Sequence, residues 1–164
     1  MRDMRDMRDL SDIRDMRHCD AYTLVELMIV LVIIGILTSV AYPNYTGFVI
    51  KSRRIEAQIA LLDIMQKQER YYSAHNSYIA FSADSSDPDE KRFKWWSGAS
   101  ARDSAYELSG HACPGLSLRS CIELRASPGT EKVNARFRDA ACETLTLVST
   151  GEHRAGGKLA GCWP

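Results

Sequence analysis

The feature that most constrains this chain is a stretch of 24 residues without a charge, from Leu27 to Ile50. A helix crosses a bilayer with roughly 18 or more apolar residues, so this stretch is long enough to do so. A secretory signal peptide would instead have a shorter apolar core, followed by a small-residue cleavage site. The sequence therefore argues against a cytosolic protein and predicts a hydrophobic transmembrane helix over residues 22–50.

A second, amphipathic pattern continues from this apolar run. Its apolar residues recur at steps of three, four or seven, with charged residues between them, which is typical of a helix with one buried face. We therefore expect one helix from about Thr23 to about Ser73, with Pro43 as a bend or local melt because proline lacks an N–H donor. The second half of this helix would lie under a globular head, within residues 51–164. The apolar positions are Phe48, Ile55, Ile59, Leu62, Met65 and Tyr72.

The periodicity changes to two in the C-terminal part of the chain. Short segments there alternate apolar and polar residues and are separated by turn signals such as Pro114-Gly115 and Pro128-Gly129, which predicts antiparallel strands. Residues 76–104 have no clear period and are expected to form a long loop that is functional or mobile. The predicted fold class is α+β, with one long helix packed on a small antiparallel sheet within residues 105–164. The strand candidates are 106–109, 122–126, 144–150 and, with a weaker alternation, 133–137.

The charges and the cysteines narrow the classes of function. Lys plus Arg and Asp plus Glu both number 21, so the net charge of zero excludes a polyanion binder that works by bulk charge and leaves a local basic patch open. Five cysteines leave one unpaired unless one lies in a segment that is removed. The four in the C-terminal third indicate two disulfides in an oxidising compartment. The cysteines are Cys19, Cys113, Cys121, Cys142 and Cys162.

Residues 1–18 form a low-complexity run that begins with three Met-Arg-Asp repeats, and together with residues 19–21 they make up one N-terminal segment. They contain almost nothing that a core could bury, so they are excluded from the predicted fold. Two interpretations stay open. The segment is either a cytoplasmic leader peptide that is removed, or the product of a start assigned too early, with translation beginning at Met7 or Met16.

The sequence contains no constellation typical of a catalytic, cofactor-binding or metal-binding site. The four histidines are scattered, and the cysteine spacings match no zinc pattern. Residues 91–96 interleave bases with aromatic rings, as binders of single-stranded nucleic acid do. The alternative, which we favour, is that the two tryptophans pin the loop against the helix while the charges stay solvated. The candidate patch comprises Lys91, Arg92, Lys94, Trp95 and Trp96.

Glu26 is a charged residue at the N-terminal end of the apolar run. A carboxylate in a hydrocarbon segment is costly and is a functional hypothesis by default; the alternative is that it marks the membrane boundary. The residues from Tyr22 to Glu26 read Tyr-Thr-Leu-Val-Glu and are followed by the apolar run, Gly35 and Pro43. This combination resembles the N-terminus of type IV pilins and the related pseudopilins.

The resemblance implies a processing site and roles for these residues. A prepilin peptidase would cut between Ala21 and Tyr22, and the new N-terminal Tyr22 would be methylated. Gly35 and Pro43 stand where the family has the glycine and proline that loosen its helix. The cut would also remove Cys19 and leave an even four cysteines. The chain departs from the family in having Ala21 where glycine is usual, and in a leader that is long and rich in Asp.

Further segments resemble minor pilins of the PilE type, so the resemblance covers most of the chain after residue 21. It implies that Cys142 and Cys162 close the C-terminal loop of a type IV pilin fold. Four cysteines allow three pairings. We expect Cys113–Cys121 as the second pair, because each pair then closes a short segment around a turn. The similar segments are 52–58, 68–72, 141–151 and 161–163.

The resemblance implies that the protein is a structural subunit of a type IV pilus, in particular a minor pilin. Its N-terminal helix would pack into the filament core, where the Glu26 carboxylate would pair with the Tyr22 amine of a neighbour. The expected partners are other pilin subunits, the prepilin peptidase and the inner-membrane assembly platform, while nucleic acid is not favoured. The subunit would wait in the inner membrane, N-terminus cytoplasmic and head periplasmic, before it enters an extracellular pilus that serves motility, adhesion or DNA uptake.

Two other classes of function stay open. One is a pseudopilin of a type II secretion system, which a calcium site near the C-terminus would favour. The other is a pilin specialised as a receptor for DNA or for surfaces, for which residues 91–96 are the relevant feature. A membrane-anchored enzyme is a more distant alternative, because the sequence offers no catalytic residues for it.

Overall fold

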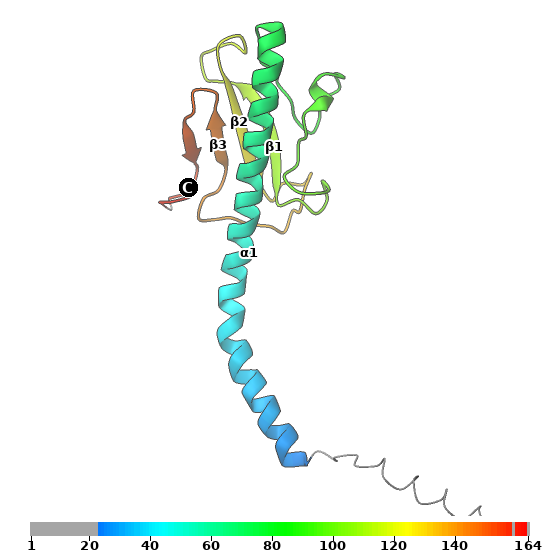
Figure 1. Ribbon diagram of the computed structural model, residues 1–164, viewed down its shortest axis with the longest axis vertical. Helices are drawn as coiled ribbons and strands as arrows, with labels where there is room; N and C mark the ends of the chain where they lie inside the picture. The colour runs from blue at the N-terminus through cyan, green and yellow to red at the C-terminus, as the bar shows by residue number, and fades with distance from the viewer. Residues whose placement is uncertain (1–22, 159, 164) are drawn as a thin grey trace, which may run out of the picture. The chain divides into compact units, whose positions relative to one another are not determined.

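The computed structural model describes residues 23–158 and 160–163, and for residues 40–44 the backbone alone. The leader, residues 1–21, and the expected processing site at Ala21 and Tyr22 lie outside the described residues. The chain divides into two compact units, one that ends at Asn44 and one, called the head below, that comprises Tyr45–Pro164. The elements are α1 (Leu24–His75), the short 3₁₀ helix η1 (Glu90–Arg92), β1 (Tyr106–Ala112), β2 (Ile122–Pro128), β3 (Leu145–Val148) and β4 (His153–Ala155) (Figure 1).

The expected long helix is present as α1, and specific hydrogen bonds define both of its ends. At the start, the Glu26 N–H donates to Thr23 Oγ1 at 3.2 Å, so Thr23 caps the first turn. At the end, Asn76 adopts a left-handed φ of 51°, which asparagine tolerates, and its N–H donates to the Tyr72 carbonyl at 2.8 Å. The helix assignment runs through Pro43. The side chain of Pro43 lies outside the described residues, so the expected bend there stays a prediction.

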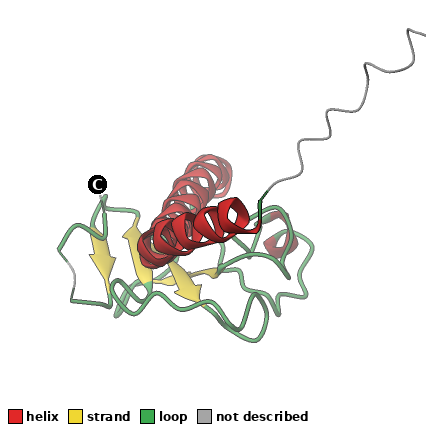
Figure 2. Ribbon diagram, turned by 90° about the horizontal axis from the view of Figure 1, so that it is seen from below, coloured by secondary structure: helices red, strands yellow, loops and turns green. Residues whose placement is uncertain are grey.

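The sheet of the head has four antiparallel strands in the order β1-β2-β3-β4. The part of α1 that belongs to the head lies across one face of this sheet (Figure 2). Leu124 of β2 stands opposite Gly110 of β1 and Leu147 of β3. These three residues lie on the same face of the sheet, because successive side chains of a strand point to opposite faces. That face is the one buried beneath the helix. The α+β fold class is therefore confirmed.

Three of the predicted strands are confirmed, and the fourth is wrong. Residues 133–137 form turns instead, with the Phe137 N–H donating to the Asn134 carbonyl at 3.0 Å. Their alternation reflects two side chains that meet the core: Val133 is buried, and Phe137 packs partly buried against the Tyr106 ring. The sequence also missed β4, because its three residues are too few to show a period of two.

The face of α1 that packs on the sheet differs from the predicted apolar stripe. Ala57, Leu61 and Ile64 are almost fully buried against the sheet, and so is the polar Gln68. Gln68 donates to the Ile79 carbonyl at 2.8 Å and accepts from the Ile79 N–H at 3.1 Å, so its burial is hydrogen-bonded. Such a position reads as solvated in the sequence, so the prediction missed this face, and of the predicted stripe only Met65 and Tyr72 pack, partly buried, against the core. The predicted positions that are exposed are Phe48 (71%), Ile55 (45%), Ile59 (62%) and Leu62 (47%).

The long loop of residues 76–104 packs along the outer edge of β1. Phe81 and Gly110 exchange backbone hydrogen bonds of 3.1 and 2.9 Å, and the Leu108 N–H donates to the Trp95 carbonyl at 2.7 Å. Phe81 also stacks on Phe93, and both rings are buried. The loop is therefore fixed against strand β1, and it is also held against α1, where Gln68 binds the Ile79 backbone and Tyr71 meets the Phe93 ring. Its pairing also protects the edge of the sheet from association with other strands.

The transmembrane helix expected over residues 22–50 includes residue 22 and the side chains of residues 40–44, which lie outside the described part of the chain, so it stays a prediction. Within residues 23–158 and 160–163, no helix has both the length and the hydropathy to cross a membrane.

We expect Gly110→Ala to destabilise the head, because an added Cβ would lie 2.6 Å from Phe81 Cε1 and 3.1 Å from Leu124 Cδ2. Overpacking of this kind costs about 1–3 kcal/mol. Gly47→Ala is the matched control, since nothing lies within 4 Å of its added Cβ and alanine should stabilise the helix by about 1 kcal/mol. Urea unfolding followed by tryptophan fluorescence compares the two. Equal midpoints would contradict the close packing at Gly110.

Candidate functional site

Glu26 lies in the first turn of α1, and its exposed carboxylate has no partner among the described residues. The residues from Thr23 to Glu26 have the spacing of a capping box, in which a glutamate reaches back to the cap N–H. One half of that box forms, the bond from the Glu26 N–H to Thr23 Oγ1. The sequence reasoning overlooked this local role, although the Thr-x-x-Glu spacing signals it. An acid here is also favoured by the helix dipole.

An unbroken apolar surface follows Glu26 along α1. Every large hydrophobic side chain from Leu24 to Leu37 is at least 47% exposed. Full burial of one such side chain is worth about 1.5–3 kcal/mol, so this surface has much to gain from a partner outside the subunit. It consists of Leu24, Val25, Leu27, Met28, Ile29, Val30, Leu31, Val32, Ile33, Ile34, Ile36 and Leu37.

Gly35 lies within this apolar surface, and nothing is within 4 Å of the place a Cβ would take. Packing among the described residues therefore does not require glycine here. In the next turn, Thr38 Oγ1 donates to the carbonyls of Ile34 and Gly35, at 2.8 and 3.0 Å, and Ser39 Oγ donates to the Ile36 carbonyl at 2.7 Å. Hydroxyl bonds of this kind weaken and bend helices. They favour a deformable helix at this point, and the loosening role of Gly35 stays a prediction.

A buried ion pair joins α1 to the C-terminal loop. Arg54 Nε and Nη2 each donate to an oxygen of Asp139 at 2.8 Å. The Tyr106 hydroxyl donates to the same carboxylate at 2.6 Å, and the Cys142 N–H does so at 3.2 Å. Asp139 is 2% exposed, and these bonds satisfy a carboxylate that would otherwise be costly to bury. We call Arg54, Asp139 and Tyr106 the clamp.

The clamp shifts the pKa values of its three side chains. Burial alone would raise the pKa of Asp139, but the hydrogen bonds from Arg54, Tyr106 and the Cys142 N–H outweigh it and hold this pKa below its usual value. Hydrogen bonding to Asp139 raises the pKa of Arg54 against the effect of burial. Burial, and then the bond to Asp139, raise the pKa of Tyr106 well above its usual value. At neutral pH the clamp is therefore an ion pair with a neutral tyrosine.

Two disulfides close the loops around the sheet, with the pairing expected from the sequence. Cys142–Cys162 has a sequence separation of 20 and Cys113–Cys121 one of 8. Gln58 of α1 donates to the Cys162 carbonyl. The helix therefore holds the C-terminal loop beside both cysteines of its disulfide, through Asp139 at one end and Gln58 at the other.

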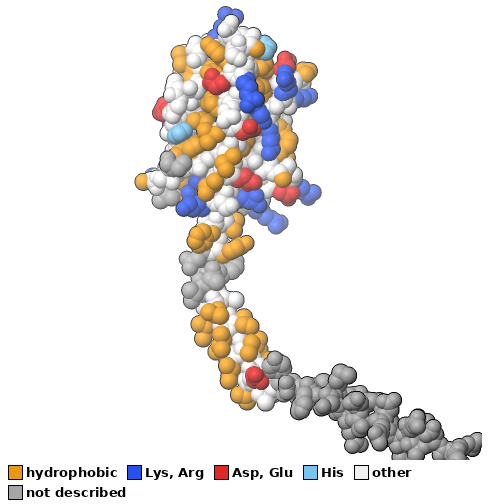
Figure 3. Space-filling view, in the orientation of Figure 1, with side chains coloured by type: hydrophobic (Ala, Val, Ile, Leu, Met, Phe, Trp, Pro, Cys, Tyr) orange, Lys and Arg blue, Asp and Glu red, His pale blue; other side chains and the backbone are white. Residues whose placement is uncertain are grey.

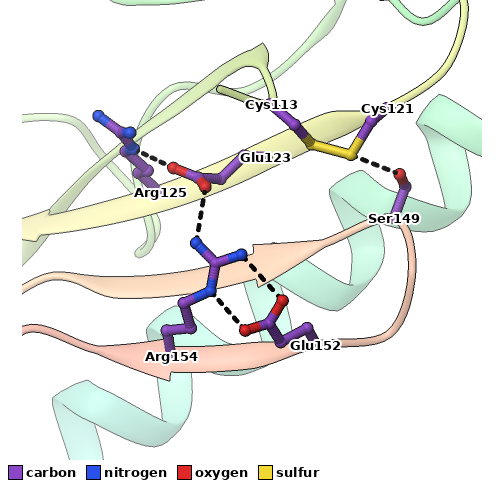
Figure 4. A network of polar contacts seen from close by, with 7 residues as sticks. All are labelled: Cys113, Cys121, Glu123, Arg125, Ser149, Glu152 and Arg154. Carbon is purple, nitrogen blue, oxygen red and sulfur yellow. Dashed lines mark hydrogen bonds and ion pairs between the residues drawn. A yellow bond between two sulfur atoms is a disulfide. The ribbon is translucent and has the colours of Figure 1, made fainter. Parts of the chain in front are cut away.

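The face of the sheet opposite α1 carries a second polar network (Figure 4). Glu123 is 3% exposed and accepts from Arg125 Nε at 2.5 Å and from Arg154 Nη1 at 3.3 Å. Arg154 also binds Glu152, at 2.7 and 2.8 Å, and this contact lowers the pKa of Glu152 and raises that of Arg154. Ser149 lies within 3.6 Å of the Cys121 sulfur beside it. Because its charges balance one another, this network offers structure and no net charge for a ligand.

In the structure, the residues of the candidate patch over 91–96 fall into two groups, those that hold the loop and those that are exposed. Lys94 donates to a backbone carbonyl four residues further on, and its Nζ lies 5.5 Å from the centre of the Trp96 ring. Trp95 packs against the hydrophobic core. These three residues therefore hold the loop in place, whereas Lys91 and Arg92 are exposed. In the part of the chain that the structure describes, no three His, Cys, Asp or Glu side chains gather as a metal site.

The sequence reasoning missed every member of the clamp. Arg54 stands in a run of charges that reads as a solvated helix face, and Asp139 lies in a segment without a period. The available signal was the position of Arg54, three residues before Ala57 on the face that is in fact buried. The position of Arg54 could be read as a signal only if the buried face of α1 was already known.

Two family profiles match this chain. Residues 43–146 match the family described as "Type IV minor pilin ComP, DNA uptake sequence receptor", and residues 16–42 match the prokaryotic N-terminal methylation motif. The first match covers more than half of the chain, and the chain belongs to this family of type IV minor pilins. It is accordingly a structural subunit of a type IV pilus, which confirms the family and the function expected from the sequence.

Individual relatives match a shorter part of the chain or share less of its sequence. The type IV major pilin protein PilA of Myxococcus xanthus (strain DK1622) is 39% identical over 61 residues, which are 37% of this chain and 28% of the relative. The chain thus spans under a third of that relative's length. A type IV pilin from Shewanella oneidensis shares 23% identity (TM-score 0.43, covering 70% of this chain and 98% of that one). The non-core minor pilin PilV of Neisseria meningitidis shares 19% (TM-score 0.44, covering 70% and 94%).

We expect Asp139→Asn to destabilise the head by about 3–5 kcal/mol, because it leaves the buried Arg54 guanidinium without its counter-charge. Tyr106→Phe is the control: it keeps the ion pair and loses one hydrogen bond to a charged group, at about 1.5–3 kcal/mol. Urea unfolding at neutral pH measures both. A smaller loss for Asp139→Asn than for Tyr106→Phe would contradict the central role of the ion pair.

The clamp also predicts a pH dependence. Because the folded state lowers the pKa of Asp139, its contribution to stability is present above the pKa of an unfolded aspartate, about 3.9, and is lost as the pH falls through the folded value. Unfolding free energies of the wild type should therefore fall below about pH 4. The Asp139→Asn curve should be flatter over the same range, and parallel curves would count against this explanation.

Proposed function

We propose that Glu26 binds the N-terminal amine of a neighbouring subunit's Tyr22 during filament assembly, after the leader has been removed. The observation that supports this is a carboxylate without a partner among the described residues, at the edge of the exposed apolar surface from Leu24 to Leu37. Helices that bury such surfaces against one another would enclose Glu26 as well. An enclosed carboxylate requires a cation, and a chain that begins at Tyr22 provides one as its amine.

The pair would fix the register of the helices more than it would strengthen their contact. Removing both charges from water costs much of what their attraction returns. Either charge left alone in apolar surroundings costs several kcal/mol. Axial offsets that leave Glu26 unpaired are therefore penalised, while the apolar contacts themselves are tolerant of sliding. Gly35, together with Pro43, would let the helix adjust to that register.

The steps before assembly rest on the match to the methylation motif over residues 16–42. A prepilin peptidase would cut between Ala21 and Tyr22 and methylate the new terminus. The precursor would be held at the inner membrane by its apolar residues, N-terminus cytoplasmic and head periplasmic, until the assembly platform transfers it to other pilin subunits. The two disulfides suit an oxidising compartment on the periplasmic side.

Glu26→Gln tests the proposed pair. Glutamine keeps the size of the side chain and can still complete a capping box, but it has no charge to offer an amine. We expect the variant to be cleaved and methylated normally, to accumulate in the inner membrane and to be depleted from sheared pili by about tenfold or more, since an unpaired buried charge costs several kcal/mol. Quantitative immunoblots of the two fractions measure this.

Glu26→Ala is the matched comparison, since it removes both the charge and the side chain that could complete the capping box, while the bond from its N–H to Thr23 Oγ1 is kept. If Glu26 acted only as a helix cap, alanine would be harmful and glutamine harmless. Wild-type amounts of the Gln variant in pili would therefore refute the ion pair. Mass spectrometry of the membrane fraction, showing a chain that begins at methylated Tyr22, confirms that the defect follows processing.

We also propose a second function, that the assembled subunit binds DNA. The supporting observation is the family itself, whose description includes a DNA uptake sequence receptor and whose match includes the exposed Lys91 and Arg92. The zero net charge of the chain restricts such binding to a local basic surface.

Binding of fluorescent duplex DNA to the purified full chain in detergent tests this function. We expect measurable affinity at low salt that falls steeply as salt rises, because Lys and Arg contacts to phosphate release counterions. A chain that shows no binding at low salt would refute DNA binding and leave the filament role untouched.

A further inference from the structure

The two edges of the four-stranded sheet differ in what covers them. Along the outer edge of β1, the loop of residues 76–104 pairs with the strand through the backbone of Phe81 and Trp95. β4 forms the other border of the sheet (Figure 1), and no backbone hydrogen bond joins a further segment of the described chain to its outer side. An unpaired strand edge is a template on which another strand can add.

The hydrogen-bond pattern identifies the unpaired backbone groups of β4. The Val148 N–H of β3 donates to the Glu152 carbonyl at 2.9 Å. Hydrogen-bonded positions alternate along an antiparallel pair, so Arg154, two residues further on, also bonds to β3. The N–H and C=O groups of His153 and Ala155 therefore point away from β3. None of these four groups has a partner among the described residues.

Contacts on both faces of the sheet hold this edge in its extended form. On the face toward α1, Trp163 stacks on His153 with ring centres 4.5 Å apart, and its Nε1 donates to the Arg154 carbonyl at 2.8 Å. On the opposite face, the Arg154 side chain binds Glu152 and Glu123 (Figure 4). A strand that is already ordered loses little conformational entropy when a partner adds to it.

The charges of β4 favour a second copy of the same edge as the partner. In one antiparallel register, His153 stands opposite His153 of the second copy. Glu152 of each copy then faces Arg154 of the other at a non-hydrogen-bonded position, where side chains are closest. Opposite charges at such positions are stabilising, and like charges are destabilising. A shift by one step places Arg154 opposite Arg154, and a further step places it opposite Gly156, so neither alternative forms the two ion pairs.

The charges of the whole molecule do not oppose such an approach. The chain has a net charge of zero. On the face that Figure 3 shows, acidic and basic side chains lie interspersed over the head. Two heads therefore meet without the mutual repulsion that a surface of one sign would produce.

We propose that two heads associate through their β4 edges, with His153 of each copy opposite His153 of the other. Each His153 N–H then donates to the His153 carbonyl of the second copy, and two pairs of Glu152 and Arg154 flank these bonds. The contact is isologous, because both copies use the same surface. Antiparallel pairing also reverses the direction of the head part of α1 between the copies. The contact thus joins subunits of opposite orientation, and its small size makes the association weak and dependent on concentration.

Cysteine cross-linking of the full chain in detergent tests this pairing. Residues opposite each other at a hydrogen-bonded position have Cα atoms about 5.5 Å apart, a separation that a disulfide can span. The test variant is His153→Cys. The matched control is His111→Cys, which changes an exposed histidine of β1 outside the proposed contact. Both variants also carry Cys19→Ser, so the introduced thiol is the one unpaired cysteine beside the two disulfides.

Non-reducing gels after mild oxidation measure the covalent dimer. We expect His153→Cys to form a dimer whose yield rises with protein concentration, and His111→Cys to form only the background that arises from random collisions. Equal yields from the two variants would show that the heads do not pair through β4, and would overturn the proposal.

A second substitution tests the register. Adding Glu152→Lys to the His153→Cys variant places a lysine opposite Arg154, and we expect the yield of dimer to fall about tenfold because two attractive pairs become repulsive. Glu131→Lys, at an exposed residue outside β4, is the matched control and should leave the yield unchanged. Equal yields from these two charge variants would contradict the proposed register. Should Glu152→Lys lower the melting temperature, Glu152→Gln, with Glu131→Gln as its control, should still reduce the yield several-fold.

Discussion

The buried ion pair between Arg54 and Asp139 is the contact on which the head depends. It holds a segment without regular secondary structure against α1, and the Cys142 N–H that binds Asp139 places the disulfide loop beside the helix. An isolated buried pair gives little net stability, because desolvation offsets its attraction. Its effect is specificity: other placements of the loop leave a charge unpaired in the core. The loop gains a fixed position, and the helix gains a fixed rotation about its axis.

This fixed rotation decides which surface α1 presents outward. With Ala57, Leu61 and Ile64 turned to the sheet, the apolar residues Ile55 and Ile59 are left exposed on the other side. The helix therefore has two apolar faces in the head, of which the subunit itself buries one. In a filament, neighbouring copies of the subunit can cover the second apolar face. An exposed apolar stripe in a monomer would otherwise favour aggregation.

The sequence was sufficient for the elements whose patterns are local. The long helix and the strands at 106–109, 122–126 and 144–150 follow from periodicity and turn signals, while the disulfide pairs follow from the resemblance to pilins together with short loop closure. The buried face of α1 could not be predicted, because Gln68 reads as solvated until its partner, the backbone of Ile79, is known. Asp139 was missed for the same reason: its partners Arg54 and Tyr106 lie 85 and 33 residues away. Buried polar residues are selected by tertiary contacts, which leave no periodic signal.

Charge placement links these observations to function. The chain is neutral overall, and its buried charges are compensated by Arg54 at Asp139 and by Arg125 and Arg154 at Glu123. Among the described residues, the charged side chains without such a partner include the carboxylate of Glu26 at the start of α1 and several exposed cations of the head, such as Arg70, Arg102 and Arg119. A neutral chain with separated local charges meets other molecules in defined orientations. Because no described cation binds Glu26, the proposed pairing with a neighbouring subunit's amine competes with no ion pair among the described residues.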